Sequence, residues 1–335
     1  MHTLPRLIVF IIATLGVLLV LIPYLPATIA GNFVYISLGG VPITLIVGIT
    51  TLVLIFRRKC KWRWIWIFIF MGDLGAIRGH FLLYNYSIEH EDSPSIQLLS
   101  WNVANFHIHE DTLQKAADFI RLFNPDIICL QERPHENLLS WETIQRAFSN
   151  YPYTARNEVR EDEVLNLAIL SKYPLSEVTE TYFEDSYNKI MATHIILPTC
   201  TFKLYNTHLQ TTGNNLTHFI SNARQRNIQA DSLSEQIQGS TLPIIVCGDF
   251  NDTPCSYVYR TLTNKLKDAF REASEEWTGS FQPMGRWLRI DYILCSKHWQ
   301  VQHYQLIENP WSDHKMQLAT LSINNEKEKK NLIPY

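Results

Sequence analysis

The pattern of hydrophobic and polar positions divides the 335-residue chain into an uncharged N-terminal part and a remainder in which both kinds of residue alternate. Residues 7–56 contain no Lys, Arg, Asp, Glu or His. An uncharged apolar run of this length is typical of membrane spans rather than of a soluble core. We therefore predict two spans, at residues 7–22 and 33–56, joined by an uncharged turn. A cleaved signal peptide would explain the first run, but not the second run that follows directly.

A basic loop follows the second predicted span. Residues 57–63 include five Lys or Arg residues, and an arginine precedes the first span. The positive-inside rule places such segments in the cytoplasm. Residues 64–86 begin with the apolar run WIWIFIFM but then carry Asp73, Arg78 and His80, which are costly at membrane depth unless paired or near an interface. We predict a third span here, which places the polar domain outside the cytoplasm; without this span the domain stays inside.

Charge separates the same two regions. Residues 1–89 carry seven Lys or Arg and two Asp or Glu, whereas the remaining residues carry 22 and 30, a net charge of −8. An acidic domain is a poor general binder of nucleic acid, because nonspecific affinity comes mainly from basic groups. The six cysteines include no CxxC or zinc-like pair. We predict a membrane anchor at residues 1–89, a catalytic domain at residues 90–324 and a polar tail at residues 325–335.

From residue 96 onward, strand-like and helical patterns alternate. An amphipathic helix is predicted at residues 112–123, a second helix at residues 138–148 and a long polar helix at residues 217–238. The predicted strands are IQLLSWNV, IICLQE, LNLAILS, THIILP, TFKLYNTHL, LPIIVCGDF, RIDYILCS and MQLATLSI. Because strands outnumber helices and neighbouring strands have short links, we predict a mixed sheet system with helices outside, an α/β sandwich.

The helix predicted at residues 217–238 carries Arg224, Arg226 and Gln229. Arg226 and Gln229 are three residues apart and therefore occupy neighbouring positions on the helix surface. An arginine that faced the cleft would bind phosphate through two hydrogen bonds. We interpret the group as a solvated helix face, with phosphate binding as the alternative.

Short polar clusters lie beside most of the predicted strands, in the segments SWNVANF, DIICLQE, LYNTHLQ, PIIVCGDFND, LRIDYIL and SDHK. Their polar members are Asn102, Glu132, His208, Asp249, Asn251, Asp291, Asp313 and His314. Each cluster alone has an ordinary explanation as a turn, a cap or a solvated strand end. Six such clusters in one chain indicate a shared polar cleft at the edge of a sheet.

The oxygen-bearing members of these clusters suit a hard metal ion. Glu132, Asp249, Asn251 and Asp313 offer carboxylate and amide oxygens, which Mg²⁺ or Mn²⁺ prefers together with water and substrate phosphate. No Cys/His ligand set competes with them. The sequence therefore predicts a divalent cation at a phosphate ester.

The two histidines supply what a metal alone lacks. His208 and His314 offer proton transfer near neutral pH or a cationic hydrogen bond to phosphoryl oxygens. Asp291 is suited to orient His314 through its other ring nitrogen. Asn102 and Asn251 would donate to phosphate oxygens or position water. Together the clusters predict hydrolysis of a phosphate ester by metal-assisted attack of water.

In these motifs the sequence resembles the endonuclease/exonuclease/phosphatase superfamily. SWNV, LQE, NTHL, GDFN, RIDYI and SDH occur in the superfamily's order, and LAILSKYPL at residues 167–175 resembles one of its strand-and-turn segments. The resemblance covers residues 96–323. It implies a four-layer α/β sandwich of the deoxyribonuclease-I type, here preceded by N-terminal transmembrane helices, with a divalent-metal site at one end of the two sheets.

The resemblance also implies which residues hold the metal and the phosphate. Glu132 is then the principal metal ligand, with Asn102 and Asp313 near it. Asn102, Asn251 and His314 contact the substrate phosphate. Mg²⁺ or Mn²⁺ is the implied cofactor.

The implied catalytic residues are His208, Asp249, Asn251, Asp291 and His314. Asp249 and Asn251 position or activate the water, and His314, paired with Asp291, contacts the scissile phosphate. His208 is the second catalytic histidine. Within the superfamily the general base is an Asp or a His, so that role stays divided between Asp249 and His314.

The predicted function is that of a membrane-anchored, Mg²⁺-dependent phosphoesterase in a bacterial inner membrane, with its catalytic domain outside the cytoplasm. The substrate is a lipid head group, a small phosphoester or a nucleic acid. Ala104 stands where apurinic endonucleases have an acidic residue, which weakens a role in DNA repair. The alternatives are a nonspecific nuclease and, in another class, a non-catalytic binding protein on the same fold.

Overall fold

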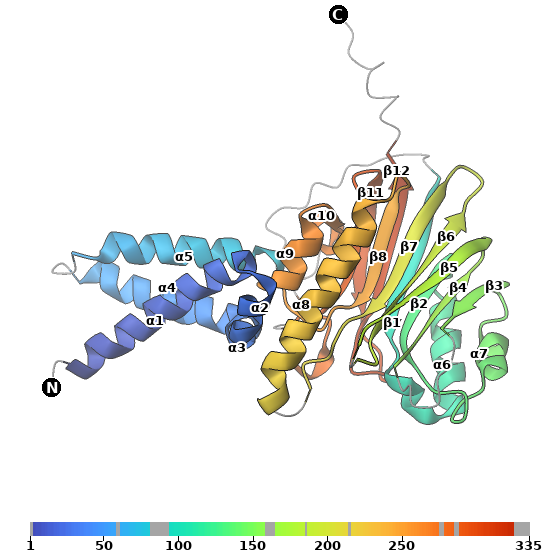
Figure 1. The fold of residues 1–335 in the computed structure, drawn as a ribbon, viewed down its shortest axis with the longest axis horizontal. Helices are drawn as coiled ribbons and strands as arrows, with labels where there is room; N and C mark the ends of the chain where they lie inside the picture. Colours follow the sequence, from blue (N-terminus) through green and yellow to red (C-terminus); the bar gives the residue numbers. More distant parts are fainter. Residues whose placement is uncertain are drawn as a thin grey trace, which may run out of the picture.

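The computed structural model describes residues 3–57, 61–80, 94–157, 165–184, 186–213, 216–274, 278–284 and 288–324. A long helical bundle extends from one side of a two-sheet α/β sandwich (Figure 1). The predicted tail at residues 325–335 and the link at residues 81–93 lie outside the described residues. The α/β sandwich expected from the strand pattern is confirmed.

The sandwich contains two six-stranded sheets among the described residues. In sheet order, the first sheet consists of β11 (Trp299–Ile307), β12 (Met316–Ile323), β1 (Ser95–Asn102), β2 (Ile127–Arg133), β4 (Asn166–Ser171) and β3 (Tyr153–Arg156). The second consists of β5 (Leu175–Tyr182), β6 (Lys189–Ile196), β7 (Thr201–His208), β8 (Ile244–Asp249), β10 (Asp291–Cys295) and β9 (Lys267–Asp268).

Two parallel strand pairs set the polarity of the sandwich. β1 pairs in parallel with β2, and β7 pairs in parallel with β8, whereas the other pairs are antiparallel. The carboxyl ends of these four strands therefore lie at the same end of the molecule. β10 and β12 run the opposite way beside them and begin at that end.

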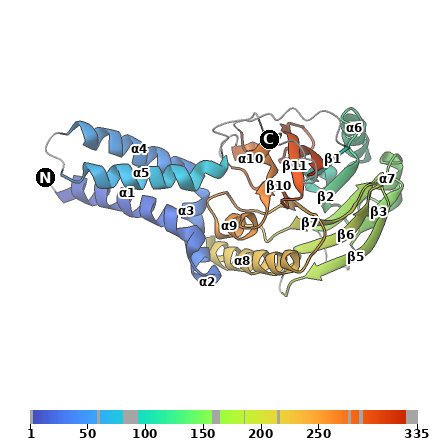
Figure 2. The same ribbon diagram turned by 90° about the horizontal axis from the view of Figure 1, so that it is seen from above.

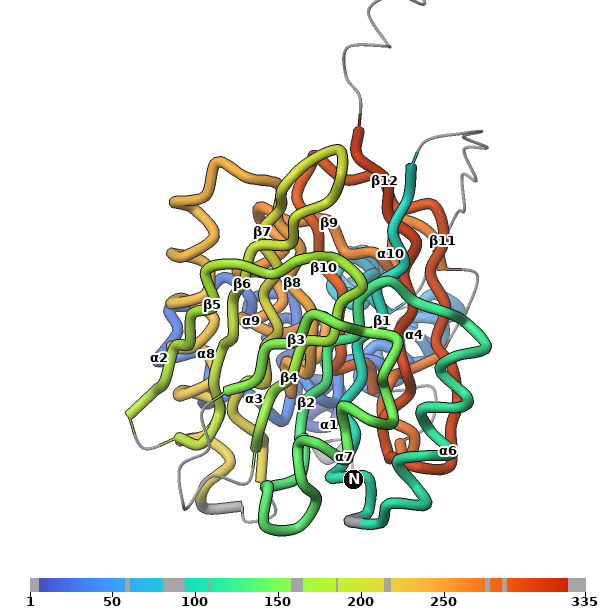
Figure 3. Tube along the Cα trace, turned by 90° about the vertical axis from the view of Figure 1, so that its right-hand side faces the viewer, coloured from blue at the N-terminus to red at the C-terminus, as the bar shows by residue number. Residues whose placement is uncertain are grey.

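Apolar side chains fill three layers of the sandwich. One cluster lies between the sheets, where Ile127 of β2 and Leu204 of β7 are fully buried. The other two lie outside them. α6 (Glu110–Arg121) and α7 (Trp141–Ala147) cover the first sheet, and α8 (Leu216–Gln238) and α9 (Tyr257–Thr263) cover the second. This helix–sheet–sheet–helix order is visible in Figures 2 and 3. The short helix α10 (Ala269–Ala273) follows β9.

The N-terminal bundle consists of α1 (Thr3–Leu21), α4 (Gly40–Phe56) and α5 (Arg63–Ile77), which lie side by side in Figures 1 and 2. The link between α1 and α4 is built from η1 (Ile22–Tyr24), α2 (Ala27–Ala30), η2 (Gly31–Phe33) and α3 (Val34–Leu38). Glycines let the long helices approach closely. A Cβ at Gly16 would lie 2.7 Å from Ile69, and one at Gly48 would lie 2.7 Å from the Phe70 ring.

The structure changes the predicted spans in one respect. The helix at Arg6–Tyr24 is long and apolar enough to cross a membrane, whereas 27–38 and 40–56 pass that test only together and meet at a 66° bend. The span predicted at residues 33–56 therefore contains a bend at Gly39, and its crossing of a membrane stays a prediction. Glycines 39 and 40 favour helix formation weakly, and Pro42 cannot donate a backbone hydrogen bond to Leu38.

The third predicted span falls partly outside the described residues. α5 ends at Ile77 and continues as η3 (Arg78–His80), and residues 81–86 are not described. Asp73, the acidic residue of this segment, is fully buried beside Gly16, inside the bundle rather than on its outer surface. An interior position is where an acidic side chain in a membrane helix costs least.

The bundle and the sandwich meet through hydrogen bonds to backbone carbonyls. Asn227 of α8 donates to the carbonyl of Ala27 at 2.7 Å, and Thr253 donates to the carbonyl of Ser37 at 2.8 Å. Arg289 donates to the carbonyl of Gly79 at 2.6 Å. The carbonyls belong to the link between α1 and α4 and to the last turn after α5. Three separate points of the sandwich are thus fixed to the bundle.

Small residues bring the loop after β8 against the bundle. A Cβ at Gly40 would lie 2.6 Å from the Cys255 sulfur, and one at Gly79 would lie 2.4 Å from Pro254. The chain reaches this contact within six residues of Asp249, the last residue of β8. The loop that leaves the predicted cleft is therefore packed directly on the bundle.

Candidate active site

The polar strand ends predicted from the sequence gather at one end of the sandwich. β1, β2, β7 and β8 bring Asn102, Glu132, His208 and Asp249 to this end, because the four strands terminate there. β10 begins at Asp291, directly opposite Asp249 in the sheet register. Residues from both sheets thus contribute to a single cluster.

Asn102 connects the two carboxylates of this cluster. Its Nδ2 donates to Glu132 Oε1 at 2.9 Å and to Asp249 Oδ2 at 3.1 Å, while its Oδ1 accepts from the Ala104 N–H at 3.1 Å. The side chain is fully buried. Two carboxylates that accept from the same amide group lie close together and repel one another unless hydrogen-bond donors or cations lie between them. Asn102 supplies one such donor to both.

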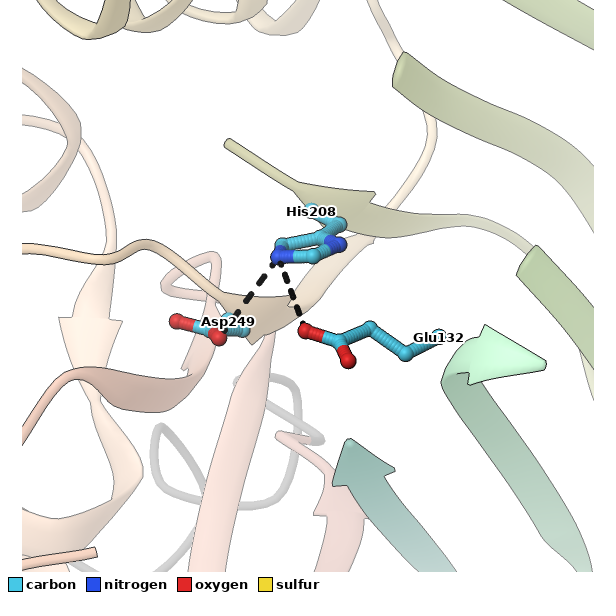
Figure 4. A group of neighbouring side chains, drawn as sticks. All are labelled: Glu132, His208 and Asp249. Atoms are coloured by element: carbon cyan, nitrogen blue, oxygen red, sulfur yellow. Dashed lines mark ion pairs between the residues drawn. The ribbon is translucent and has the colours of Figure 1, made fainter. Parts of the chain in front are cut away.

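His208 faces the same two carboxylates (Figure 4). Its Nε2 lies 3.7 Å from Glu132 Oε1 and 3.7 Å from Asp249 Oδ2, and the side chain is 1% exposed. Among the described residues, neither ring nitrogen has a hydrogen-bond partner. A buried polar atom without a partner is costly, so this position favours an additional ligand between the imidazole and the carboxylates.

His314 reaches the cluster from the loop before β12. Its Nδ1 lies 3.1 and 3.0 Å from the two carboxylate oxygens of Asp291, and its Nε2 lies 3.8 Å from Asp249 Oδ2. The ring packs edge-on against Phe281, with 5.2 Å between centroids. Ser312 Oγ donates to the Asn102 carbonyl at 2.7 Å and accepts from the His314 N–H at 3.0 Å. The loop is therefore tied to the end of β1.

Asp313 and Asn251 lie around this centre. Asp313 is 49% exposed, and its Oδ1 lies 3.9 Å from His314 Nε2, so it occupies the rim. Asn251 is half-buried; its N–H donates to Asp249 Oδ1 at 2.8 Å, and its Nδ2 donates to the Leu209 carbonyl at 3.0 Å. Asn251 thus holds one oxygen of Asp249 while Asn102 holds the other.

Unusual backbone angles aim several of these side chains. Glu132 has φ 51° and Asn251 has φ 53°, in a region that residues other than glycine rarely adopt. The register between β2 and β4 shifts between Leu130 and Arg133, which indicates a bulge at Glu132. Gly248 has φ 132°, and a Cβ there would lie 1.9 Å from the Thr207 carbonyl oxygen. Only glycine lets β7 and β8 deliver His208 and Asp249 side by side.

Comparison with known proteins shows which protein family has this arrangement of residues. The model of the endonuclease/exonuclease/phosphatase family matches residues 99–314, which include all eight predicted site residues. The chain belongs to the endonuclease/exonuclease/phosphatase family. Members of this family are phosphoric ester hydrolases, and the family generally uses a divalent metal.

Individual family members are distant in sequence. Nocturnin of Xenopus laevis is 23% identical over 237 residues, which cover 61% of this chain and 56% of nocturnin. The chain therefore matches little more than half of that relative's length. The human nocturnin catalytic domain with bound sulfate is 22% identical with a TM-score of 0.56, and covers 69% of this chain and 94% of its own. A family protein from Bacteroides thetaiotaomicron is 16% identical with a TM-score of 0.57, covering 70% and 99%. These structures share the fold.

The family site in this chain holds groups with shifted pKa values. Burial raises the pKa of Asp249 to about 6, and the neighbouring Asp291 acts in the same direction. Burial alone would lower the pKa of His314, but the carboxylates of Asp291 and Asp249 outweigh it and raise the pKa to about 10. Burial also raises the pKa of Glu132 and lowers that of His208. The site thus concentrates negative charge that burial disfavours.

A divalent cation fits the residues that the family site contains. Glu132, His208 and Asp249 form one group whose ligand atoms lie within 4.8 Å of one another, and Asp249, Asp291 and His314 form a second. The carboxylate oxygens of these groups suit Mg²⁺ or Mn²⁺, whereas the His208 nitrogen is suited to a water or a phosphoryl oxygen beside the cation. Asp313, predicted as a ligand, belongs to neither group, whereas Asn102 is bonded to Glu132.

Two polar residues within the family motifs escaped the sequence prediction. Gln131 Nε2 donates to Asn206 Oδ1 at 2.7 Å, and Asn206 Nδ2 donates to the carbonyls of Leu130 and Ala168 at 3.0 and 2.9 Å. Both side chains are fully buried between the sheets. Leu204, Asn206 and His208 lie on the same, inward face of β7, because every second residue of a strand points the same way. That period of two was the signal in the sequence that could have identified Asn206. The pair fixes the spacing of the strands that carry Glu132 and His208.

The solvated helix face predicted at Arg226 and Gln229 is wrong. Both side chains are fully buried. Arg226 Nε lies 3.1 Å from Asp252 Oδ2, and its Nη1 donates to the Gln210 carbonyl at 2.9 Å. Gln229 Oε1 accepts from the Gln210 N–H at 2.6 Å. An aspartate that lies far along the chain neutralises the arginine and allows its burial.

Proposed function

We propose that this chain is a membrane-anchored, divalent-metal-dependent phosphoesterase that cleaves a phosphodiester or phosphomonoester by attack of water. The observation that supports the proposal best is the cluster of half-buried Glu132 with buried His208 and Asp249 (Figure 4), whose two carboxylates both accept from Asn102. Complete family motifs argue against a non-catalytic binding protein, since none of the eight site residues is replaced.

Glu132 is the residue that we assign as the principal ligand of Mg²⁺ or Mn²⁺, with Asn102 and Asp313 completing the protein contribution. When bound, the cation polarises the phosphoryl oxygen and offsets the charge that develops on it. His208 lies opposite Glu132, where its unpartnered Nε2 can bind a phosphoryl oxygen or a water. The bulge at Glu132 directs its carboxylate toward this space.

We assign the general base to Asp249 rather than to His314. The Nδ1 of His314 faces both oxygens of Asp291, which favours the doubly protonated ring. An imidazolium donates through Nε2 to a phosphoryl oxygen and cannot accept a proton from water. Asp249, fixed by Asn251 and Asn102, remains available to accept that proton.

The bundle supports membrane anchoring through its outer surface. Phe10, Ile49 and Phe68 are 69%, 65% and 77% exposed on α1, α4 and α5. Apolar side chains so exposed are suited to lipid. The start of α1, the end of α4 and the start of α5, which flank the basic segment at residues 57–63, lie at the end of the bundle away from the sandwich (Figure 1). By the positive-inside rule, the sandwich would face the outside of the cytoplasmic membrane.

The substrate that we favour is a small phosphoester or a lipid head group rather than nucleic acid. The net charge of −8 after residue 89 disfavours contact with a polyanionic backbone. The bound sulfate in the human nocturnin domain is a tetrahedral anion of the kind that a phosphate site accepts. A nuclease would require a steep fall of binding with salt, which separates it from the favoured class.

Hydrolysis of bis-p-nitrophenyl phosphate by the full-length protein in detergent tests the proposal. We expect activity with Mg²⁺ or Mn²⁺ that EDTA abolishes, and a fall of roughly 10²–10⁴-fold in kcat for Glu132→Gln and for His314→Ala. Glu142→Gln removes an equivalent carboxylate from the exposed surface of α7 and should leave kcat unchanged. Equal activity of all variants would refute the site assignment.

A phosphatase or fluorescent-protein reporter fused after Tyr335 tests the proposed topology. An alkaline phosphatase fusion should be active, because three spans carry the C-terminus out of the cytoplasm. A fluorescent protein that folds only in the cytoplasm should stay dark. An inactive alkaline phosphatase fusion together with a fluorescent fusion that emits would refute the predicted third span.

A further inference from the structure

A cavity of about 560 Å³ lies where the bundle meets the sandwich. One wall comes from the end of α1 and the second half of α5, including Val20, Pro23 and Gly75. The opposite wall comes from α9 and α10 and the segment between them. None of the eight predicted site residues lines it. Its volume falls in the range of ordinary ligand sites, roughly 300–1,000 Å³.

The cavity carries an excess of positive charge. Its basic residues are Arg78, Arg260, Lys267 and Arg271, and its acidic residues are Asp268 and Glu272. Asp268 is paired with Arg289 at 2.5 Å, and Glu272 lies 3.9 Å from Lys267. Across the described ranges, no ion pair involves Arg78, Arg260 or Arg271. Three guanidinium groups at one cavity therefore have no carboxylate partner within the described part of the chain.

One of these arginines is held at the junction of the two regions. The Arg260 guanidinium lies 4.0 Å from the centroid of the Tyr24 ring, so α9 and η1 together fix its position. Tyr24 is 66% exposed, as expected of an aromatic residue at a membrane–water interface. The basic residues of the cavity thus lie near Tyr24, where the apolar N-terminal helix ends.

The apolar side of the cavity remains open along α5. A Cβ added to Gly75 would meet nothing within 4 Å, and one added to Gly72 would meet Val20 at 3.0 Å. Gly75 therefore leaves free space beside the helix among the residues that the structure describes. A chain of methylene groups fits such a space, next to guanidinium groups that suit a phosphate.

We propose that this cavity binds one anionic glycerophospholipid, whose phosphate lies among Arg78, Arg260 and Arg271 and whose acyl chain runs beside Gly75. Basic pockets beside transmembrane helices bind anionic head groups on the cytoplasmic side of membranes, and the same attraction between guanidinium and phosphate acts at this cavity on the opposite side. The lipid is a structural ligand that joins bundle to sandwich, at a site separate from the catalytic cluster. The inference rests on the proposed membrane insertion of the bundle and is independent of the proposed hydrolase activity.

Native mass spectrometry of the full-length protein in detergent tests this site with phosphatidylglycerol and phosphatidylcholine of identical acyl chains. We expect phosphatidylglycerol to remain bound more tightly than phosphatidylcholine. Arg260→Gln combined with Arg271→Gln should weaken its binding roughly tenfold. Gly75→Phe should weaken it without a change of charge, because the new ring occupies the acyl space. Arg146→Gln combined with Lys297→Gln removes two exposed basic groups elsewhere on the sandwich and should have no effect.

The outcomes distinguish the lipid from a free phosphate and from the basic loop. Every variant keeps the basic residues at 57–63, so any lipid that they bind contributes equally to all measurements. Equal binding of the two lipids, or equal effects of the cavity and control variants, would overturn the proposal. Protection against thermal unfolding by glycerol phosphate equal to that by phosphatidylglycerol would also overturn it, because the site would then take a soluble phosphate. Phosphoesterase activity and resistance to alkaline extraction from membranes, measured on the same variants, report separately on the proposed function.

Discussion

The bundle and the sandwich place the same kinds of side chain in opposite positions. On the bundle, large apolar residues such as Phe68 point outward, while Gly16 and Asp73 lie inside. In the sandwich, large apolar residues fill the interior, and polar residues gather at one end. The difference is what the proposed insertion of the bundle into a membrane requires. Helices in lipid gain little from apolar contact with one another and associate through close packing, which glycine permits.

The junction shows how these two designs are combined. Polar side chains of the sandwich donate to backbone carbonyls of the bundle at Ala27, Ser37 and Gly79. Such bonds add side-chain donors to carbonyls near helix ends, where the intrahelical hydrogen bonds are incomplete. The bundle is thereby fixed to the loop that leaves Asp249, and the two regions should respond together when this contact is broken.

Loss of Arg289 should have the largest effect on stability and would show whether the two regions unfold as one. Arg289 is fully buried, pairs with Asp268 and donates to the Gly79 carbonyl of the bundle. Arg289→Met leaves the Asp268 carboxylate buried without its partner, so we expect a loss of about 3–5 kcal/mol. Thermal unfolding in detergent, followed by circular dichroism, measures it.

A second variant makes the Arg289 experiment specific. Arg289→Met with Asp268→Leu removes both charges and should recover part of the lost stability, because no carboxylate is left unpaired. A single transition that moves as a whole would support joint unfolding. Two transitions, with only that of the sandwich displaced, would mean that the bundle and the sandwich are independent.

Alanine at two glycines compares close packing in the two regions directly. At Gly248, where φ is 132°, the new Cβ would lie 1.9 Å from the Thr207 carbonyl oxygen. That oxygen belongs to the backbone of the neighbouring strand β7 and cannot shift as a side chain can. We expect a loss of about 3 kcal/mol and a displaced His208. At Gly48 the Cβ meets the Phe70 ring at 2.7 Å, and a side chain on a bundle surface can shift. We expect a loss below about 2 kcal/mol there. Equal losses in melting experiments would contradict this contrast.

The sequence predicted the elements whose pattern is local. Strands with continuous apolar runs, such as β2 and β8, and the polar residues that follow them were found, because burial on both faces marks them. β5 was missed because its sequence, LSEVTETY, is mostly polar and its side chains are half-buried or exposed. The bend at Gly39 was missed because apolar composition continues through it.

Features that depend on distant partners were beyond the sequence. Arg226 is buried because Asp252, 26 residues away, neutralises it, and no local pattern reveals that partner. The same holds for the cavity at the junction, whose walls come from the first 80 residues and from residues 254–272. Motif order predicted which residues would gather at the site, but not that Asn102 would hold two carboxylates at once.

The smallest predicted effect tests whether the bundle supports the catalytic loop. Thr253 lies two residues after Asn251, and its Oγ1 donates to the Ser37 carbonyl of α3 at 2.8 Å. Thr253→Val keeps the shape but removes this hydrogen bond from a buried carbonyl, at a cost of about 1 kcal/mol. Thr263→Val is the matched control, since the Thr263 hydroxyl donates within α9, to the Tyr259 carbonyl.

If the junction positions Asn251 and Asp249, Thr253→Val should lower kcat severalfold while Thr263→Val does not. Equal kcat in both variants would leave the bundle as an anchor alone, without influence on the site that it carries.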